Sequence, residues 1–169
     1  MKLKKIICWP PLLGGVGAGV TITILAYITF QSILAGTNYG LWLAASFGSS
    51  VVVVFGYPNN EFAQPKNVFF GHLLCGLIGV IFVTLFKISQ DRSIFFLAIG
   101  LAVGISVMLM MIFKIAHPPA GGNTIVVIIA QESFQFLLFP IIAGAVTIII
   151  GGVIYNRFIL KKKYPLRWS

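Results

Sequence analysis

Residues 93 to 131 read SIFFLAIGLAVGISVMLMMIFKIAHPPAGGNTIVVIIAQ, and this stretch decides the fold. It opens with an apolar run, about residues 93–113, that is long enough for a membrane-spanning helix, which needs roughly 17 to 25 residues. Two prolines and two glycines then interrupt the chain. The apolar run that follows the interruption is too short to cross a bilayer alone. The stretch therefore predicts a full helix followed by a half-helix inside a membrane.

The composition points to an integral membrane protein. Of 169 residues, 59% are hydrophobic and 9% are charged, whereas a soluble domain has roughly a quarter charged residues. Three acidic residues, Glu61, Asp91 and Glu132, stand against twelve Lys and Arg. So few acidic residues argue against paired-carboxylate hydrolases, calcium loops and two-metal sites. The lipid bilayer is the first partner that the sequence predicts.

Runs without acidic or basic residues recur along the chain, at about 10–35, 39–57, 67–86, 93–113, 118–131 and 134–156. The second and fifth runs are short. The second opens with the small and polar residues Ser46 to Ser50 before Val51 to Phe55, and the fifth opens with Pro118 to Thr124. Each is predicted to be a half-helix that is entered through a loop. The prolines predict that the fourth helix ends at about Ala116.

The chain resembles itself in two halves. Laying residues 48–56 over 122–130 pairs Gly48 with Gly122 and Ser50 with Thr124, and laying the first run over the fourth pairs Gly15, Gly19 and Thr21 with Gly100, Gly104 and Ser106. These glycines predict small faces for close helix packing. We expect an all-α membrane protein whose six membrane segments form two inverted three-segment repeats, each with a broken short helix in its middle. A single transmembrane domain, 1–169, would contain repeat 1 (about 10–88), repeat 2 (about 92–158) and a basic tail (159–169).

The distribution of basic residues predicts the orientation. With both termini cytoplasmic, ten basic residues lie inside and two, Lys87 and Arg92, lie outside. The inside set is Lys2, Lys4, Lys5, Lys66, Lys114, Arg157, Lys161, Lys162, Lys163 and Arg167. This pattern favours anionic lipid over nucleic acid as the partner of the positive charge. We expect a bacterial inner membrane protein that associates with copies of itself.

The two short segments supply the candidate substrate site. If both begin near the middle of the membrane, their facing N-termini present N–H groups and partial positive charge to a small anion. Neutral donors would be Ser49, Ser50, Asn123 and Thr124, and Gly48, Gly121 and Gly122 would let the backbone approach the ion. The alternative is that these residues cap short helices and pack tightly.

The two histidines are candidates for proton carriage. His117 precedes Pro118 and lies at the mouth of the proposed site, whereas His72 lies inside the third run. Either is also explained as a hydrogen-bond partner within the bundle. Two histidines do not complete a metal site, and Cys8 and Cys75 are isolated. We predict neither metal nor cofactor.

Several of these residues carry a resemblance. The run His117-Pro118-Pro119-Ala120-Gly121-Gly122, with Ser46-Phe47-Gly48-Ser49-Ser50 and with Gln64-Pro65-Lys66-Asn67-Val68 through Gly71-His72, resembles the HPP family of integral membrane proteins over most of the chain. The resemblance implies a membrane fold. It also implies nitrite transport as a candidate activity, because some cyanobacterial and plastid members transport nitrite, while other members carry soluble regulatory domains. Gly122 and Asn123 stand where the family pattern is expected to vary.

The leading interpretation is a transporter or channel for a small inorganic anion, with nitrite first, and not an enzyme. No acidic residue lies inside an apolar run, so a coupling proton would need His117 or His72. A non-transporting membrane subunit or sensor is one alternative. An intramembrane serine hydrolase that uses Ser49 or Ser50 with His117 is another, although no glycine-built oxyanion loop is recognisable.

Overall fold

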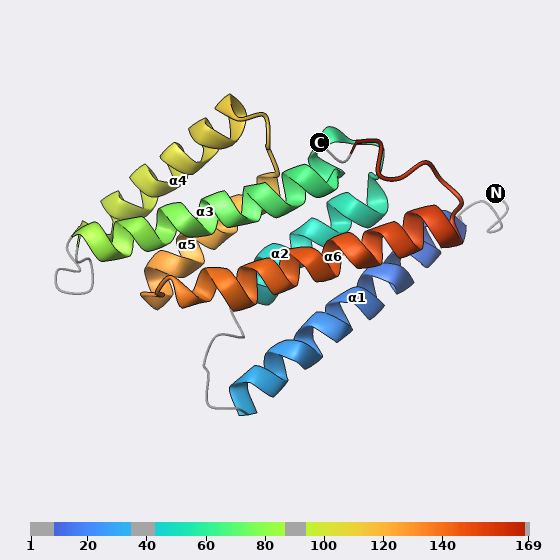
Figure 1. Ribbon diagram of the computed structural model, residues 1–169, viewed down its shortest axis with the longest axis horizontal. Coiled ribbons are helices and arrows are strands. Elements are labelled where there is room, and N and C mark those ends of the chain that lie inside the picture. Colours follow the sequence, from blue (N-terminus) through green and yellow to red (C-terminus); the bar gives the residue numbers. More distant parts are fainter. Residues whose placement is uncertain (1–8, 35–42, 87–93, 168–169) are drawn as a thin grey trace, which may run out of the picture.

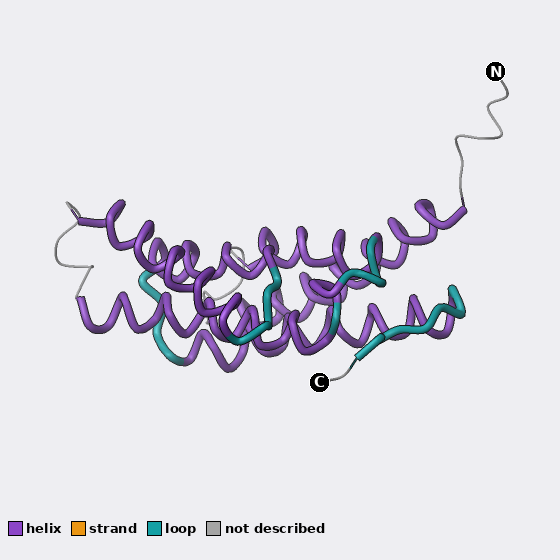
Figure 2. The backbone as a smooth tube through the Cα atoms, turned by 90° about the horizontal axis from the view of Figure 1, so that it is seen from above, coloured by secondary structure: helices purple, strands orange, loops and turns teal. Residues whose placement is uncertain are grey.

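The computed structural model describes residues 9–34, 43–86 and 94–167, and within these ranges the chain folds into helices joined by short loops, without strands (Figure 2). The elements are α1 (Trp9–Leu34), α2 (Leu43–Val51) continued by a π-helical turn (Val52–Gly56), a 3₁₀ turn (Glu61–Ala63), α3 (Pro65–Phe86), α4 (Phe95–Ile112), a 3₁₀ turn (Pro118–Ala120), α5 (Gly121–Ala130), and a last helix made of a π-helical start (Leu137–Ile142), α6 (Ala143–Val153) and a π-helical end (Ile154–Ile159).

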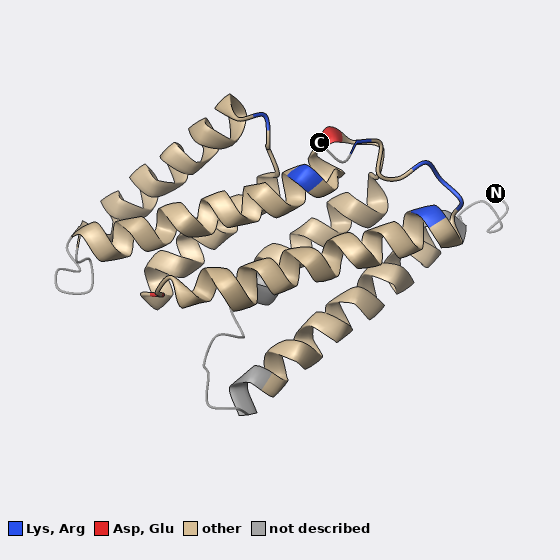
Figure 3. Ribbon diagram, viewed as in Figure 1, with Lys and Arg blue, Asp and Glu red and all other residues tan. Residues whose placement is uncertain are grey.

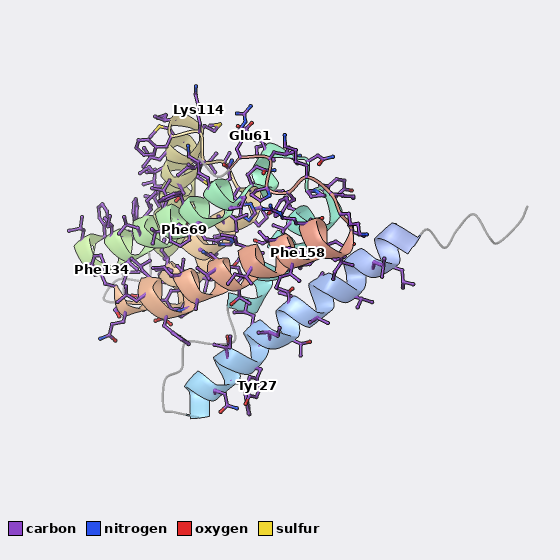
Figure 4. The ribbon with its side chains drawn as sticks, turned by 45° about the vertical axis from the view of Figure 1, so that its right-hand side comes forward. Tyr27, Glu61, Phe69, Lys114, Phe134 and Phe158 are labelled. Carbon is purple, nitrogen blue, oxygen red and sulfur yellow. The ribbon has the colours of Figure 1, made fainter. Side chains whose placement is uncertain are left out.

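Four of these helices are long and apolar enough to cross a membrane: Pro11–Gln31, Pro65–Phe86, Phe95–Ile112 and Leu137–Ile159. The two remaining apolar helices, Ser46–Gly56 and Pro118–Ala130, are shorter. The predicted all-helical membrane fold is confirmed, and the short helices fall in the second and fifth apolar runs. Large apolar side chains such as Tyr27, Phe134 and Phe158 are exposed and point away from the bundle, as lipid-facing residues do (Figure 4).

Helix α3 lies at the centre of the bundle and contacts α4, α5 and α6, while α1 packs against α6 and α2 (Figure 1). The two short helices contact each other. Starting from the middle of the bundle, α2 runs toward the end where the long helix α1 begins, and α5 runs toward the opposite end (Figure 1). The first turns of α5 therefore lie beside α2, well inside the bundle.

The described charges gather at one end of the bundle. Blue Lys and Arg segments lie where α3 begins and where α4 and the last helix end, and a red acidic segment lies at the opposite end, between α5 and the last helix (Figure 3). Glu61, Lys66, Lys114 and Arg167 line one cavity at the basic end. This polarity agrees with the grouping that the basic residues predict. Several residues of that prediction lie outside the described residues, namely Lys2, Lys4, Lys5, Lys87, Arg92 and also Cys8.

The end of α4 differs from the prediction. The helix ends at Ile112 rather than at about Ala116, because Lys114 takes a left-handed conformation with φ 53°. The N–H of Ile115 then donates to Met110 O at 3.0 Å, which closes the helix end in a Schellman arrangement. Residues 115–117 continue as a non-helical segment that carries Ile115 and His117 into the interior.

The glycine-containing helix faces pack differently from the prediction. At Gly15, Gly19, Gly100 and Gly104 an added Cβ would meet no atom within 4 Å, so these glycines do not bring described helices together. The close approach is instead made at Gly17, where a Cβ would lie 2.9 Å from the Tyr155 ring. This contact seats α1 on the last helix.

The chain after the last helix is packed against the bundle. Tyr164 is 2% exposed, and its hydroxyl donates to Ala63 O at 2.7 Å. The side chain of Gln64 accepts from Leu166 N–H at 2.8 Å and donates to Pro58 O at 2.9 Å. Gln64 therefore ties the loop before α3 to residues near the C-terminus.

Candidate functional site

A network of polar side chains lies inside the bundle, where α2, α3, α5 and the segment 115–117 meet. Its members are at most 6% exposed, and all are neutral types or histidine: Ser46, Ser50, His72, His117 and Asn123. Buried polar groups are expected to be paired, and these pair with one another. We call this set the core network.

The core network is a continuous chain of hydrogen bonds. Ser46 Oγ donates to Asn123 Oδ1 at 2.7 Å, and Asn123 Nδ2 lies 2.9 Å from His72 Nδ1. His72 Nε2 lies 2.8 Å from Ser50 Oγ, which lies 2.9 Å from His117 Nε2. The chain ends where His117 Nδ1 meets Phe62 O at 2.7 Å. Helices far apart in sequence are thus joined through one serine hydroxyl.

The end groups of the network fix the tautomers of its two imidazoles. Because a carbonyl oxygen only accepts, His117 Nδ1 must carry the proton toward Phe62 O. Asn123 Nδ2 also lies 3.3 Å from His72 O, so its amide nitrogen faces His72 and donates to Nδ1. His72 therefore carries its proton on Nε2, and the two neutral histidines are opposite tautomers.

A second set of buried polar groups lies next to the core network in α5. Thr124 is fully buried, and its hydroxyl donates to Cys75 O at 2.9 Å. It also lies 2.9 Å from the hydroxyl of Ser106 in α4. These bonds connect α3, α4 and α5 one helical position away from Asn123. Sequence alignment of the two halves pairs Thr124 with Ser50, and both side chains are 0% exposed.

The structure brings the predicted site residues together in one region, as a buried layer of polar side chains with more exposed small residues beside it. Ser50, His72, His117, Asn123 and Thr124 form the buried layer. The small residues lie outside it: Ser49 is exposed, and Gly48, Gly121 and Gly122 are partly exposed. A Cβ added at Gly48 or Gly121 would meet no atom within 4 Å, so space is open beside both.

The predicted pair of facing helix N-termini is wrong in its backbone detail. Gly48, Ser49 and Ser50 lie inside α2, which begins at Leu43, so their N–H groups are not at a helix start. In the other half, the helical turns begin at Pro118, and two prolines there have no N–H to offer. The N–H of Ala120 donates to His117 O at 2.9 Å. Donors for a ligand must therefore come from side chains.

Two cavities at the basic end share part of their lining. One of about 290 Å³ is lined by Glu61, Phe62, Asn67, Met111, Lys114 and Ala116. The other, about 140 Å³, is lined by Glu61, Gln64, Lys66, Asn67, Lys114 and Arg167. They share Glu61, Asn67 and Lys114, and we call them together the basic vestibule. Lys114 and Glu61 lie at the same edge of the bundle (Figure 4).

Residues that line the basic vestibule either bond to His117 or directly precede it in the chain, so one residue separates the vestibule from the core network. Phe62, which lines the vestibule, provides the carbonyl that receives the His117 Nδ1–H. Ala116, which also lines it, precedes His117 in the chain, and its carbonyl accepts from Asn67 Nδ2 at 2.9 Å. His117 therefore lies between the charged vestibule and a buried, neutral region.

Sequence reasoning missed part of the site. Ser46 lies one helical turn before Ser50, a spacing that could have predicted a shared face. The spacing of Ser106 with Gly100 and Gly104 indicates only a packing role, and the sequence holds no signal for the Phe62 carbonyl or the vestibule. Among the described residues there is no group of three or more His, Cys, Asp or Glu side chains that could hold a metal ion.

Comparison with known proteins identifies the family. A family model described as HPP, transmembrane region, matches residues 5–165. The chain belongs to the HPP family. Two curated proteins of Dictyostelium discoideum, each named a transmembrane protein, are similar to it: one is 34% identical over 152 residues, covering 87% of this chain and 52% of its own length, and the other is 31% identical over 133 residues, covering 76% and 42%. The chain thus spans about half the length of these relatives or less. No solved structure matches it.

The residues of the run His117-Pro118-Pro119 have separate structural roles in this HPP protein. His117 enters the core network, whereas Pro118 and Pro119 begin the short helix that carries Asn123 and Thr124. Because proline fixes φ near −65°, the turn after His117 is pre-set for a helix. The motif therefore positions an imidazole and the polar side chains that follow it.

Proposed function

We propose that this HPP protein transports a small inorganic anion, with nitrite as the first candidate and nitrate or another monovalent anion next. The observation that carries the proposal is the core network: neutral donors buried in a membrane bundle, one residue from the basic vestibule. The HPP family membership supports a transporter-like role.

The charge arrangement favours an anion over a cation. The vestibule is lined by three cations, Lys66, Lys114 and Arg167, and by one carboxylate, Glu61. Such a cavity attracts anions and raises their local concentration. Beyond it the described core offers no carboxylate to coordinate a cation, whereas hydroxyl, imidazole and amide N–H groups suit an ion that only accepts hydrogen bonds.

The transported ion would move by exchanging hydrogen bonds with the core network. The ion would accept hydrogen bonds from Ser50 O–H, His72 Nε2–H and Asn123 Nδ2–H, which in this structure bond to other members of the core network. Thr124 lies next, and Ser49 with Gly48, Gly121 and Gly122 borders the open side of the same region. Because no fixed cation holds the ion there, release stays fast.

The fold supports the orientation and assembly that we propose with this function. Both chain ends would face the cytoplasm of a bacterial inner membrane, because the described basic residues share one end of the bundle. The opposite directions of α2 and α5 support two inverted repeats with six membrane segments. The open faces at Gly15, Gly19, Gly100 and Gly104 support a homo-oligomer.

An intramembrane serine hydrolase is the second candidate, because Ser50 Oγ lies 2.9 Å from His117 Nε2 while Phe62 O orients the other ring nitrogen. This is the geometry of a nucleophile and its base. We nevertheless propose that the protein is not an enzyme, since Ser50 lies inside α2, where the backbone N–H groups beside it are used by the helix and do not form an oxyanion hole. A fluorophosphonate probe separates the two, because it labels a hydrolase at Ser50 and leaves a transporter unlabelled.

A non-transporting membrane subunit or sensor is the third candidate, since the described part of the fold would also suit a protein without flux.

The test of the proposed transport is nitrite uptake into liposomes that contain only this protein. Ser50→Ala removes the hydroxyl that joins both histidines, and we expect uptake to fall about tenfold or more, the rate effect of ~1.4 kcal/mol. Thr147→Ala is the matched control, because its hydroxyl bonds only to Ala143 O within α6. Equal rates for wild type and protein-free liposomes would contradict the proposal.

A further inference from the structure

We propose that His117, and not His72, takes up one proton together with each transported anion, and that the Ser50 hydroxyl is the switch that makes room for it. The proposal rests on the anion-transport function above and names its coupling. It is carried by the donors and acceptors around three side chains whose positions are fixed by the surrounding helices.

When both histidines are neutral, the donor and acceptor of every hydrogen bond in the core network can be assigned. His72 Nε2–H donates to Ser50 Oγ, and the single Ser50 proton is then donated to His117 Nε2. His117 Nδ1–H donates to Phe62 O. Both imidazoles are neutral in this arrangement, and no ring nitrogen lacks a partner.

A second acceptor for the Ser50 proton lies within reach. Ser50 Oγ is 3.1 Å from Ser46 O, the carbonyl one turn back in α2. If His117 gains a proton on Nε2, it donates to Ser50 Oγ, and the Ser50 O–H rotates to Ser46 O. The hydroxyl then accepts from both imidazoles. Protonation of His117 therefore needs one hydroxyl rotation and no movement of a heavier atom.

His72 lacks such an alternative. A proton on its Nδ1 would face the Nδ2 donor of Asn123, 2.9 Å away. Turning the Asn123 amide over would place its oxygen against His72 O, where the amide nitrogen now donates, and Ser46 Oγ would have to change from donor to acceptor. One hydrogen bond would be replaced by the repulsion of two oxygens, so the network holds His72 neutral.

The anion itself must neutralise a protonated His117. The elements that contact the ring present neutral groups: Ser50 from α2, His72 from α3 at 5.0 Å between ring centroids, and the Phe62 carbonyl. The charged groups on its vestibule side are Glu61, Lys66, Lys114 and Arg167, of which three are cations. Because a buried unpaired charge is costly, proton uptake and anion binding strengthen each other equally.

The step is balanced with one proton and one anion. A hydronium ion supplies the proton and becomes water, and the proton forms an N–H bond at His117 Nε2 as the anion arrives. When the anion leaves, that N–H bond breaks and the proton returns to water on the side of release as hydronium. The net charge moved is zero, so the membrane potential does not oppose uptake.

Nitrogen NMR of the untagged protein labelled with ¹⁵N-histidine tests the assignment directly, because the chain contains two histidines. We expect one histidine to be the Nδ1–H tautomer and the other to be the Nε2–H tautomer. The His117 signals are those that persist in His72→Gln. Adding nitrite should shift the titration of His117 to higher pH and leave His72 neutral. Identical tautomers, titration of His72, or a His117 titration that does not depend on nitrite would overturn the proposal.

Proteoliposomes with a trapped pH indicator test the coupling, with protein-free liposomes as the background for nitrous acid leakage. We expect about one proton per nitrite for wild type and for His72→Gln, whatever the loss in rate. His117→Gln should carry nitrite with no protein-dependent proton. Nitrite uptake by wild type without protons would overturn this inference and leave the proposed function standing. Absence of any nitrite uptake would instead contradict the proposed function.

Discussion

At the residue scale, the position of His117 depends on a glycine in the neighbouring helix. A Cβ at Gly71 would lie 2.9 Å from the Cβ of His117 and 3.3 Å from Ile115 O. Only a residue without a side chain lets α3 approach the segment 115–117 this closely. That approach places His72 and His117 on the same hydroxyl. Gly71 is therefore part of the site although it donates and accepts nothing there.

Gly71→Ala should lower the free energy of unfolding in detergent by about 1–3 kcal/mol, the usual cost of overpacking. It should also reduce nitrite uptake, because His117 must shift. Gly48→Ala is the control for stability, since Gly48 lies inside helix α2 with open space at its Cβ. Alanine there should be neutral or add up to ~1 kcal/mol through helix propensity. Equal stability of the two variants would contradict the packing account.

At the scale of elements, the helix ends carry the site. Lys114, Gln131 and Lys161 have positive φ values of 53°, 56° and 54°, and each lies at or just after a helix end. The turn at Lys114 is the functional one, because it releases residues 115–117 from α4 and directs His117 inward. The lysine that makes this turn also lines the basic vestibule.

Lys114→Gly should raise stability by about 1 kcal/mol, because glycine adopts the left-handed conformation without strain. The same change removes a vestibule cation, so we expect the nitrite concentration for half-maximal uptake to rise about two- to fivefold, as for a surface charge worth 0.5–1 kcal/mol. Gln131→Gly relieves a similar turn at the far end and should stabilise without changing uptake. Thermal unfolding and uptake kinetics measured on both variants separate the two effects.

The elements themselves could be predicted from the sequence, and the helix ends could not. Uncharged runs determine where the long helices lie, since a charge inside lipid is expensive, and each described α-helix lies largely within such a run, with Lys66 in the first turn of α3 and Arg157 near the end of the last helix. The end of α4 was missed because a left-handed lysine has no sequence signal comparable to glycine. The site residues were found by type, as in Ser50, His117 and Asn123. Their bonding to one another depends on tertiary contacts between α2, α3 and α5 that spacing does not encode.

At the scale of the whole molecule, the charges lie at a basic end of the bundle and the neutral network is buried in its interior. The described basic residues lie at one end with the vestibule, and Glu132 lies at the other (Figure 3). Burial raises the pKa of Glu132, so this carboxyl takes up a proton at a higher pH than an exposed carboxylate would. A field of this kind draws anions toward His117.

Single cysteines test this orientation. In a background of Cys8→Ala and Cys75→Ala, Ser133→Cys reports the turn between α5 and α6, and Lys163→Cys reports the chain after the last helix; both native positions are exposed. We expect a membrane-impermeant maleimide to label the first from outside intact cells and the second only after lysis. Labelling of both from the same side would rule out the proposed topology.

The most direct measurement is a side-by-side flux assay of purified wild-type protein in liposomes, with nitrite, nitrate, chloride and potassium. A bundle whose buried network offers donors, and whose entrance is lined by Lys66, Lys114 and Arg167, should pass at least one of the anions well above protein-free liposomes and should exclude potassium. We expect nitrite to be the fastest. Potassium flux without flux of any anion would contradict the account.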